Sequence, residues 1–174
     1  MALLEGLDLA GWIVTGDAKF TQKKLVAKII EKHGDCVLTA KDNQPTLVAD
    51  IATLFDDPQV VAETITTTRR IDTHGSRIEV RQLRASSALS AKYLGWPGVR
   101  QVFRIERWRR NKRTGLREHR VVYGITTLPR RGLMPDAWPS WPEGIGASRT
   151  ACIGCGMWTW AKTPVASARA RRPR

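Results

Sequence analysis

The sequence predicts an α/β fold with three parts: a βαβα unit over residues 1–60, a β-rich basic region over 61–128, and a tail over 129–174. Two observations carry this prediction. The hydrophobic pattern changes near residue 60, from short apolar runs alternating with helical periods to strand-like alternation. The charge balance changes at the same place, from mildly acidic to strongly basic.

The first part reads as strand, helix, strand, helix. The segments are a buried strand at 11–15, an amphipathic helix at 21–34, a buried strand at 35–42 and an amphipathic helix at 44–57. Thr21 is the expected N-cap of the first helix and Gly34 its stop signal. This order in so short a chain predicts a parallel strand pair with helical crossovers.

The middle part has the period of strands. The expected elements are a hairpin of 62–72 and 76–86, a short helix and turn at 87–98, and a second hairpin of 99–111 and 116–128. Basic side chains alternate with Val, Ile and Phe, which predicts one apolar face and one Arg-rich face.

The chain carries 29 Lys and Arg against 16 Asp and Glu, a formal net charge of +13. Residues 1–60 hold 6 basic and 9 acidic residues, a net charge of −3, while residues 61–131 hold 17 basic and 5 acidic residues, a net charge of +12. Such a concentration of positive charge indicates a polyanionic partner, most simply nucleic acid.

No apolar run approaches the length of a membrane-spanning helix, and Glu5 and Asp8 stand where a signal peptide is positively charged. Three cysteines, an odd number, argue against a disulfide framework. These features predict a cytoplasmic protein with no membrane partner.

Asp17 is the strongest catalytic and metal-binding candidate, because it follows the first predicted strand at its carboxyl end, where ligands collect in open α/β sheets. The alternative is a helix-capping or turn Asp. Lys41, Asn43 and Gln44 follow the second strand and are candidates for contacts to phosphate or base edges, although Asn-Gln-Pro is also ordinary turn chemistry.

The basic middle offers a phosphate-tracking surface, for which the alternative is a solvated β-sheet face. Its candidate nucleic-acid-binding residues are Arg104, Arg107, Arg109, Arg110, Lys112 and Arg113, with Trp108 among them.

Cys152 and Cys155 form a Cys-x-x-Cys pair in the tail, but no second pair or His lies at zinc spacing and no redox-type strand and helix flank them. A zinc-dependent tail module is nevertheless kept as a third hypothesis. The tail follows no period, although residues 132–174 hold four of the seven Trp and five of the nine Pro.

An ordered run of motifs resembles the bacterial H-repeat-associated insertion-sequence transposases of the DDE superfamily. The run covers residues 3–129 and includes "LDLAGWIVTGDAKFTQ", "KDNQP", "THGSRIEVR", "WPGVRQVFRIER" and "VVYGITTLP". His74 and Arg77 match the family's His-Gly-Arg-Ile-Glu and are further nucleic-acid-binding candidates, although a turn His is also often solvated. The resemblance implies a partial RNase H-like core followed by a β-rich insertion.

The resemblance also implies a mechanism and partners. The family binds the terminal inverted repeats of its element as DNA partner and uses Mg²⁺-bound carboxylates to cleave and transfer strands. The resemblance further implies a homo-oligomer and a location in the bacterial cytoplasm, associated with the nucleoid. Asp17 corresponds to the second catalytic Asp. The first Asp belongs to a strand upstream of the matched region, so the expected sheet has two parallel strands with an open edge.

The family's final Glu lies in a His-Trp-x-Ile-Glu-Asn motif that residues 129–174 do not contain. Reading residues 144–164 with the frame shifted by one base permits "HWGIEN" followed by "LHWV" and "DVDLGEDA", and the same shift over residues 132–144 permits a plausible amphipathic helix. This predicts an out-of-frame, disordered tail, and the gene's nucleotide sequence tests it. The sequence thus predicts a DDE transposase fragment without strand-cleaving activity; the alternative is a non-catalytic basic nucleic-acid-binding protein.

Overall fold

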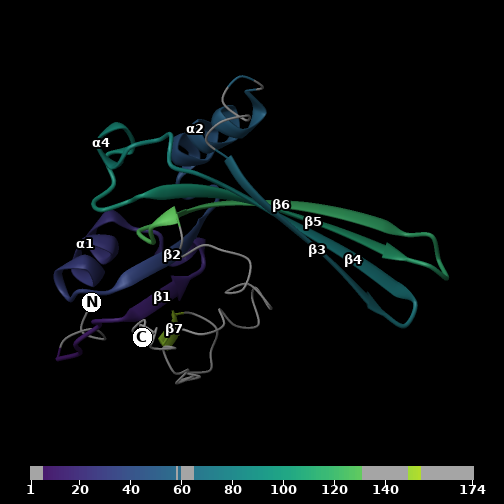
Figure 1. Cartoon of the computed structure of the whole chain (residues 1–174), viewed down its shortest axis with the longest axis horizontal. Coiled ribbons are helices and arrows are strands. Elements are labelled where there is room, and N and C mark those ends of the chain that lie inside the picture. Colours follow the sequence, from purple (N-terminus) through teal and green to yellow (C-terminus); the bar gives the residue numbers. More distant parts are fainter. Residues whose placement is uncertain (1–5, 58, 60–64, 131–148, 154–174) are drawn as a thin grey trace, which may run out of the picture.

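The computed structural model describes residues 6–57, 59, 65–130 and 149–153. They form an α/β fold built on one mixed sheet with the strand order β3-β4-β5-β6-β2-β1-β7 (Figure 1). The elements in chain order are β1 (Trp12–Gly16), the 3-10 helix η2 (Ala18–Phe20), α1 (Lys23–Glu31), β2 (Asp35–Ala40), α2 (Pro45–Asp56), β3 (Ile65–His74), β4 (Arg77–Ser86), α4 (Ala91–Leu94), β5 (Gln101–Asn111), β6 (Arg117–Thr126) and β7 (Arg149–Ile153).

The predicted βαβα unit is confirmed. β1 and β2 pair in parallel, with Val14 beside Cys36 and Gly16 beside Leu38. The apolar faces of α1 and α2 pack on the same side of the sheet, and they bury a cluster that includes Ile29 and Ile51, both fully inaccessible to solvent. Helical spacing of apolar residues in 21–34 and 44–57 is what directs these faces to the core.

One detail of the first helix differs from the prediction. Gln22, not Thr21, is the N-cap residue of α1 and makes no side-chain cap bond. Thr21 is fully buried, and its hydroxyl donates to the carbonyl oxygen of Thr39 at 2.5 Å. A buried hydroxyl needs such a partner, and Thr21 thereby connects η2 to β2.

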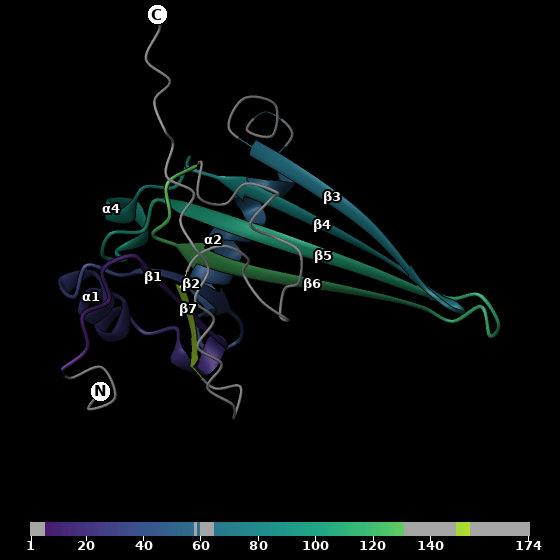
Figure 2. The same ribbon diagram turned by 60° about the horizontal axis from the view of Figure 1, so that its bottom comes forward.

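Both predicted hairpins are confirmed, and together they form a four-stranded antiparallel arm. β3 to β6 pair in sequence order and extend well beyond the α/β unit (Figures 1 and 2). The first turn is Gly75–Ser76, where the sequence predicted residues 73–75, so that His74 lies opposite Arg77. We call β3, β4, β5 and β6 the arm, and its two turns with the flanking residues 74–77 and 110–117 the arm tip.

The prediction of a two-stranded sheet with an open edge is wrong, because the arm continues the same sheet. β6 pairs antiparallel with β2 over the positions Val37 to Ala40. Two threonine hydroxyls add side-chain hydrogen bonds between β2 and the end of β6. Thr126 donates to the carbonyl oxygen of Cys36 at 2.7 Å, and Thr127 donates to the Asp35 carboxylate at 2.7 Å. The α/β unit and the arm therefore share backbone hydrogen bonds.

The other edge of β1 also has a partner. β7 pairs with β1 in parallel, from Trp12 beside Arg149 to Gly16 beside Ile153. These five residues form a strand where the sequence predicted a tail without regular structure. Residues 131–148 and 154–174, to which the rest of that prediction refers, lie outside the described part of the chain.

No helix among the described residues is both long and apolar enough to cross a lipid bilayer.

Candidate nucleic-acid interface

Asp17 lies where the sequence predicted it, directly after β1 at the carboxyl end of the parallel strands. Its Oδ1 accepts a hydrogen bond from the backbone N–H of Ala18 at 2.7 Å and caps η2. The same oxygen accepts from the Thr39 hydroxyl at 3.3 Å and lies 3.4 Å from the Lys41 ammonium. Two predicted residues, Asp17 and Lys41, are thus neighbours.

These contacts lower the pKa of the Asp17 carboxyl below its ordinary value. The Ala18 N–H is the largest cause, and the Lys41 ammonium and Thr39 hydroxyl act in the same direction against partial burial. Hydrogen bonds to the charged form and a nearby positive charge both favour ionisation. Asp17 is therefore an ionised, exposed helix cap paired with a lysine.

Asn43 and Gln44 also reach this edge, but their side chains bind the backbone. The Asn43 amide donates to the carbonyl oxygen of Ala18 at 2.6 Å, and the Gln44 amide donates to the carbonyl oxygen of Thr21 at 3.2 Å. Both side chains thereby tie the loop after β2 to the segment after β1. Their donors are engaged within the protein, which favours the structural interpretation of the "KDNQP" motif.

The residues around Asp17 do not fit a Mg²⁺ site. Magnesium in phosphodiester chemistry takes oxygen ligands from two or three carboxylates, whereas the ionic neighbour of Asp17 is an ammonium group. Over the described part of the chain, no three His, Cys, Asp or Glu side chains gather closely enough to hold a metal ion.

Cys36 is the cysteine whose side chain the structure describes. Cys36 is fully buried, and this burial raises the pKa of its thiol to about 12. Burial keeps the Cys36 thiol protonated and away from solvent, which disfavours a role as a nucleophile. The zinc hypothesis depends on Cys152 and Cys155. Cys152 lies in β7, and Cys155 lies outside the described residues, so the hypothesis stays a prediction.

Three of the predicted arm arginines are paired with carboxylates in the sheet. Arg104 Nη1 lies 2.7 Å from Asp56 Oδ1 of α2, and its Nε lies 2.9 Å from Glu106 Oε1. Arg107 Nε lies 3.3 Å from Glu79 Oε1. Arg109 Nε donates to Glu79 Oε2 at 2.8 Å. Their side chains are only 15 to 31% exposed, so this part of the predicted surface is an internal ion-pair network.

Glu79 is the centre of that network. Its side chain is 9% exposed and also accepts from Arg81. Burial raises the pKa of the Glu79 carboxyl, but the hydrogen bonds from Arg81 and Arg109 and the charge of Arg107 outweigh it, and the net pKa is lowered. A buried carboxylate that stays ionised holds its arginines in place through charge-assisted bonds.

The other predicted arm residues gather at the arm tip. His74 and Arg77 flank the first turn, while Arg110, Lys112 and Arg113 surround the second, and all five are exposed. The two turns are joined by a hydrogen bond from the Lys112 N–H to the carbonyl oxygen of Ser76 at 2.6 Å. Positions some forty residues apart in sequence therefore form one basic surface.

The cations of the arm tip have no acidic partners within the described residues. The set comprises Arg77, Arg110, Lys112, Arg113 and Arg117. Arg117 was not among the sequence candidates, although the register of the second hairpin places it directly opposite Arg110. Like charges opposite one another destabilise a strand pair, so this arrangement costs stability.

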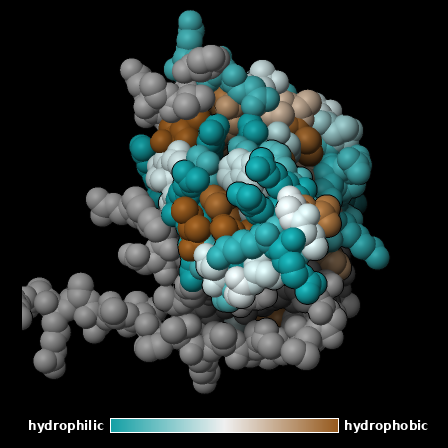
Figure 3. All heavy atoms as spheres, turned by 90° about the vertical axis from the view of Figure 1, so that its right-hand side faces the viewer, coloured by the Kyte–Doolittle hydropathy of each residue, from teal (hydrophilic) through white to brown (hydrophobic). Residues whose placement is uncertain are grey.

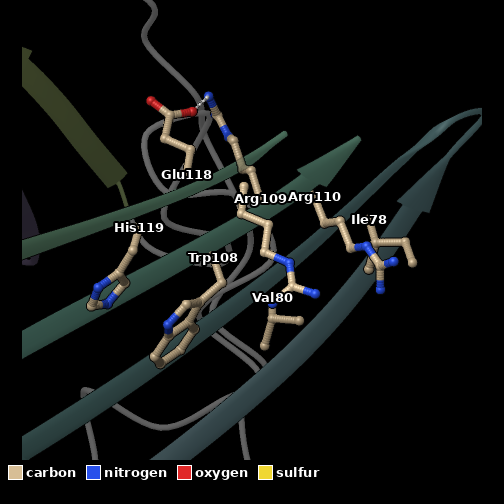
Figure 4. A pocket seen from close by; sticks show the side chains of 8 residues that line it. Ile78, Val80, Trp108, Arg109, Arg110, Glu118 and His119 are labelled. Atoms are coloured by element: carbon tan, nitrogen blue, oxygen red, sulfur yellow. Dashed lines mark ion pairs between the residues drawn. The ribbon is translucent and has the colours of Figure 1, made fainter. Parts of the chain in front are cut away.

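An open pocket of about 440 Å³ lies beside the arm tip (Figure 4). Its walls combine aliphatic, aromatic and charged side chains: Ile78, Val80, Trp108, Arg109, Arg110, Arg117, Glu118 and His119. Viewed along the arm, hydrophilic side chains surround small apolar patches (Figure 3). The sequence drew attention to Trp108 but not to its neighbours on β4 and β6.

No family model, curated protein or solved structure matches this chain. The likeness to H-repeat-associated transposases accordingly depends on the sequence motifs alone.

Proposed function

We propose that this chain is a nucleic-acid-binding polypeptide derived from a DDE transposase, and that it contacts the phosphate backbone through the arm tip. The observation that carries the proposal is the group of five exposed cations without acidic partners around two joined turns. The transposase ancestry is proposed from the motif order in residues 3–129.

The contrast within the arm supports the arm tip as the contact surface. Arg104, Arg107 and Arg109 are paired with Asp56, Glu106 and Glu79, whereas the cations of the arm tip have no such partner among the described residues. When exposed, unpaired Lys and Arg side chains bind phosphate, they release counterions that were condensed on the nucleic acid. This release is the main source of sequence-independent affinity. The arm extends away from the α/β unit, with its two turns at the far end (Figure 2).

Removing three arm-tip cations is expected to weaken DNA binding strongly. The variant Arg110→Gln, Lys112→Gln, Arg113→Gln loses three phosphate-binding charges, and the dissociation constant for a labelled duplex should rise at least about tenfold at moderate salt. Fluorescence anisotropy measures it.

The matched control removes three exposed cations elsewhere: Lys24→Gln, Lys92→Gln, Arg100→Gln. Its net charge equals that of the arm-tip variant, so general electrostatic attraction changes equally in both. An equal loss of affinity in the two variants would show that the arm tip is not the contact surface.

The chain is expected to bind DNA without cleaving it. At Asp17 a single carboxylate is paired with Lys41, and two-metal cleavage needs several carboxylates to hold both ions. Incubation of the full chain with element-end DNA and Mg²⁺ or Mn²⁺ should leave the DNA intact. Nicking that disappears in Asp17→Ala would overturn the non-catalytic part of the proposal.

A further inference from the structure

The register of the arm places two rows of side chains side by side on one face. The first row crosses all four strands and is apolar and aromatic: Ile71, Val80, Trp108 and His119. The second row, two residues nearer the turns, consists of Thr73, Ile78, Arg110 and Arg117. Two residues along a strand span about 7 Å. One small ligand can therefore reach both the aromatic rings and the cations of Arg110 and Arg117, which lie opposite each other.

The aromatic pair in the first row is held in a fixed arrangement. The Trp108 and His119 rings are stacked, with centroids 5.0 Å apart and an interplanar angle of 6° (Figure 4). His119 Nε2 lies 3.2 Å from a carboxylate oxygen of Glu106, which is itself buried. Trp108 also lines the pocket beside Ile78 and Val80, and a ring already packed against a neighbour loses less conformational freedom when a ligand stacks on it.

We infer that this pocket binds an unpaired nucleobase beside Trp108 and His119, and that the arm therefore prefers single-stranded nucleic acid to a duplex. The inference rests on the proposed nucleic-acid binding and adds the class of substrate. A flat apolar ring joined to an anionic group is the chemistry that an aromatic row beside Arg110 and Arg117 recognises. In a duplex the base faces are already stacked on one another, whereas an unpaired base has a free face.

The charge of the pocket argues against a second copy of the chain as its occupant. Two copies meeting at this face would bring Arg110 and Arg117 of each together, with no acidic residue of the arm tip to neutralise them. Glu118 on the pocket rim already pairs with Arg109 and Arg120. A strand of phosphates supplies the missing negative charge.

The test compares three ligands of equal length: a labelled oligodeoxythymidine strand, the same strand with abasic positions, and a duplex. Trp108→Leu keeps the row apolar but removes the aromatic ring. It should weaken binding of the thymidine strand at least about fivefold and leave binding of the abasic strand and the duplex unchanged. Tyr93→Leu is the matched control, because Tyr93 is an aromatic side chain 67% exposed on α4, away from the arm.

Each outcome separates the inference from the proposed function. Duplex binding that persists while Trp108→Leu has no effect on the thymidine strand overturns the inference alone. An equal loss on the thymidine and abasic strands does the same, because it shows a change of the arm and not of stacking. Absence of binding to every ligand overturns the proposed function. Self-association that Trp108→Leu abolishes in sedimentation experiments would assign the pocket to a second copy and overturn the inference.

Discussion

Glu79→Gln should lower the free energy of unfolding of the arm by about 3 kcal/mol. The substitution keeps the shape of the side chain but removes the charge that holds three arginines, Arg81, Arg107 and Arg109. Removing one partner of a buried ion pair leaves the others uncompensated, and the partial exposure of these arginines places the effect at the lower end of the usual range. Urea denaturation followed by circular dichroism measures the change.

Glu118→Gln is the matched control for this effect. Glu118 also pairs with two arginines, but its side chain is 43% exposed, and exposed pairs contribute at most about 1 kcal/mol. Equal losses in Glu79→Gln and Glu118→Gln would contradict a buried network centred on Glu79.

The lowered pKa of Glu79 fixes the direction of its pH dependence. A carboxyl whose pKa is lower in the folded state stabilises that state fully at pH values above the unfolded pKa, which is ordinarily 4.5. This stabilisation is lost as the pH falls through the lower folded value. Acid should therefore destabilise the native arm over that window, and the stability difference between the native chain and Glu79→Gln should shrink there.

Gly124→Val should destabilise the whole sheet by about 3 kcal/mol, because position 124 has no room for a side chain. A Cβ atom there would lie 2.2 Å from Phe103 Cζ and 2.4 Å from the carbonyl oxygen of Leu38. Gly124 lies opposite Thr39 in the β2–β6 ladder, so the strain falls on the junction that joins the arm to the α/β unit. Thermal unfolding should show a large drop in the midpoint.

A double-mutant cycle separates crowding from other effects at this junction. Phe103→Leu removes ring atoms that a Cβ at position 124 would meet, so it should recover part of the loss caused by Gly124→Ala. Residues in contact show coupling energies of about 0.5–3 kcal/mol. Strictly additive effects of the two substitutions would mean that Phe103 does not pack over Gly124.

Local pattern predicted the strands β1 to β6, the parallel pair and the two hairpins, but it missed β7 and the pairing that joins the arm to β2. Apolar spacing predicted the βαβα unit and its parallel strand pair, and the four-residue turn at 112–115 placed Arg110 opposite Arg117. The pairing of β6 with β2 joins residues almost ninety positions apart, and no local signal encodes it. The addition of β7 beside β1 is equally non-local.

Register decided which arginines were candidates for binding. The sequence placed the first turn at residues 73–75, whereas it is Gly75–Ser76, and such a shift changes every pairing between β3 and β4. Glu79 lies opposite Arg109 in the β4–β5 ladder, a pairing between two hairpins that no local pattern predicted, and the two side chains form an ion pair. Alternation places Arg107 and Arg109 on one face of β5 and Arg110 on the other, but it could not show that Glu79 of β4 pairs with the first two.

At the sheet edge around Asp17, the sequence predicted the positions of the polar side chains but not their roles. Its position after β1 was predicted from the strand and turn pattern, and the alternative of a helix cap describes the contacts that Asp17 makes. Asn43 and Gln44 came to the same edge as predicted, but as donors to backbone carbonyl oxygens. Residue type and spacing are the same for both roles, and the hydrogen-bond partners distinguish them.

The salt dependence of duplex binding tests the central claim most directly. Each phosphate contact contributes about 0.9 to the slope of log K against log salt concentration, so the native chain should show a steep slope. The variant lacking Arg110, Lys112 and Arg113 should lose about two to three units of that slope, while the variant lacking Lys24, Lys92 and Arg100 should keep it. A slope that is the same in the native chain and the arm-tip variant would contradict DNA binding by the arm tip.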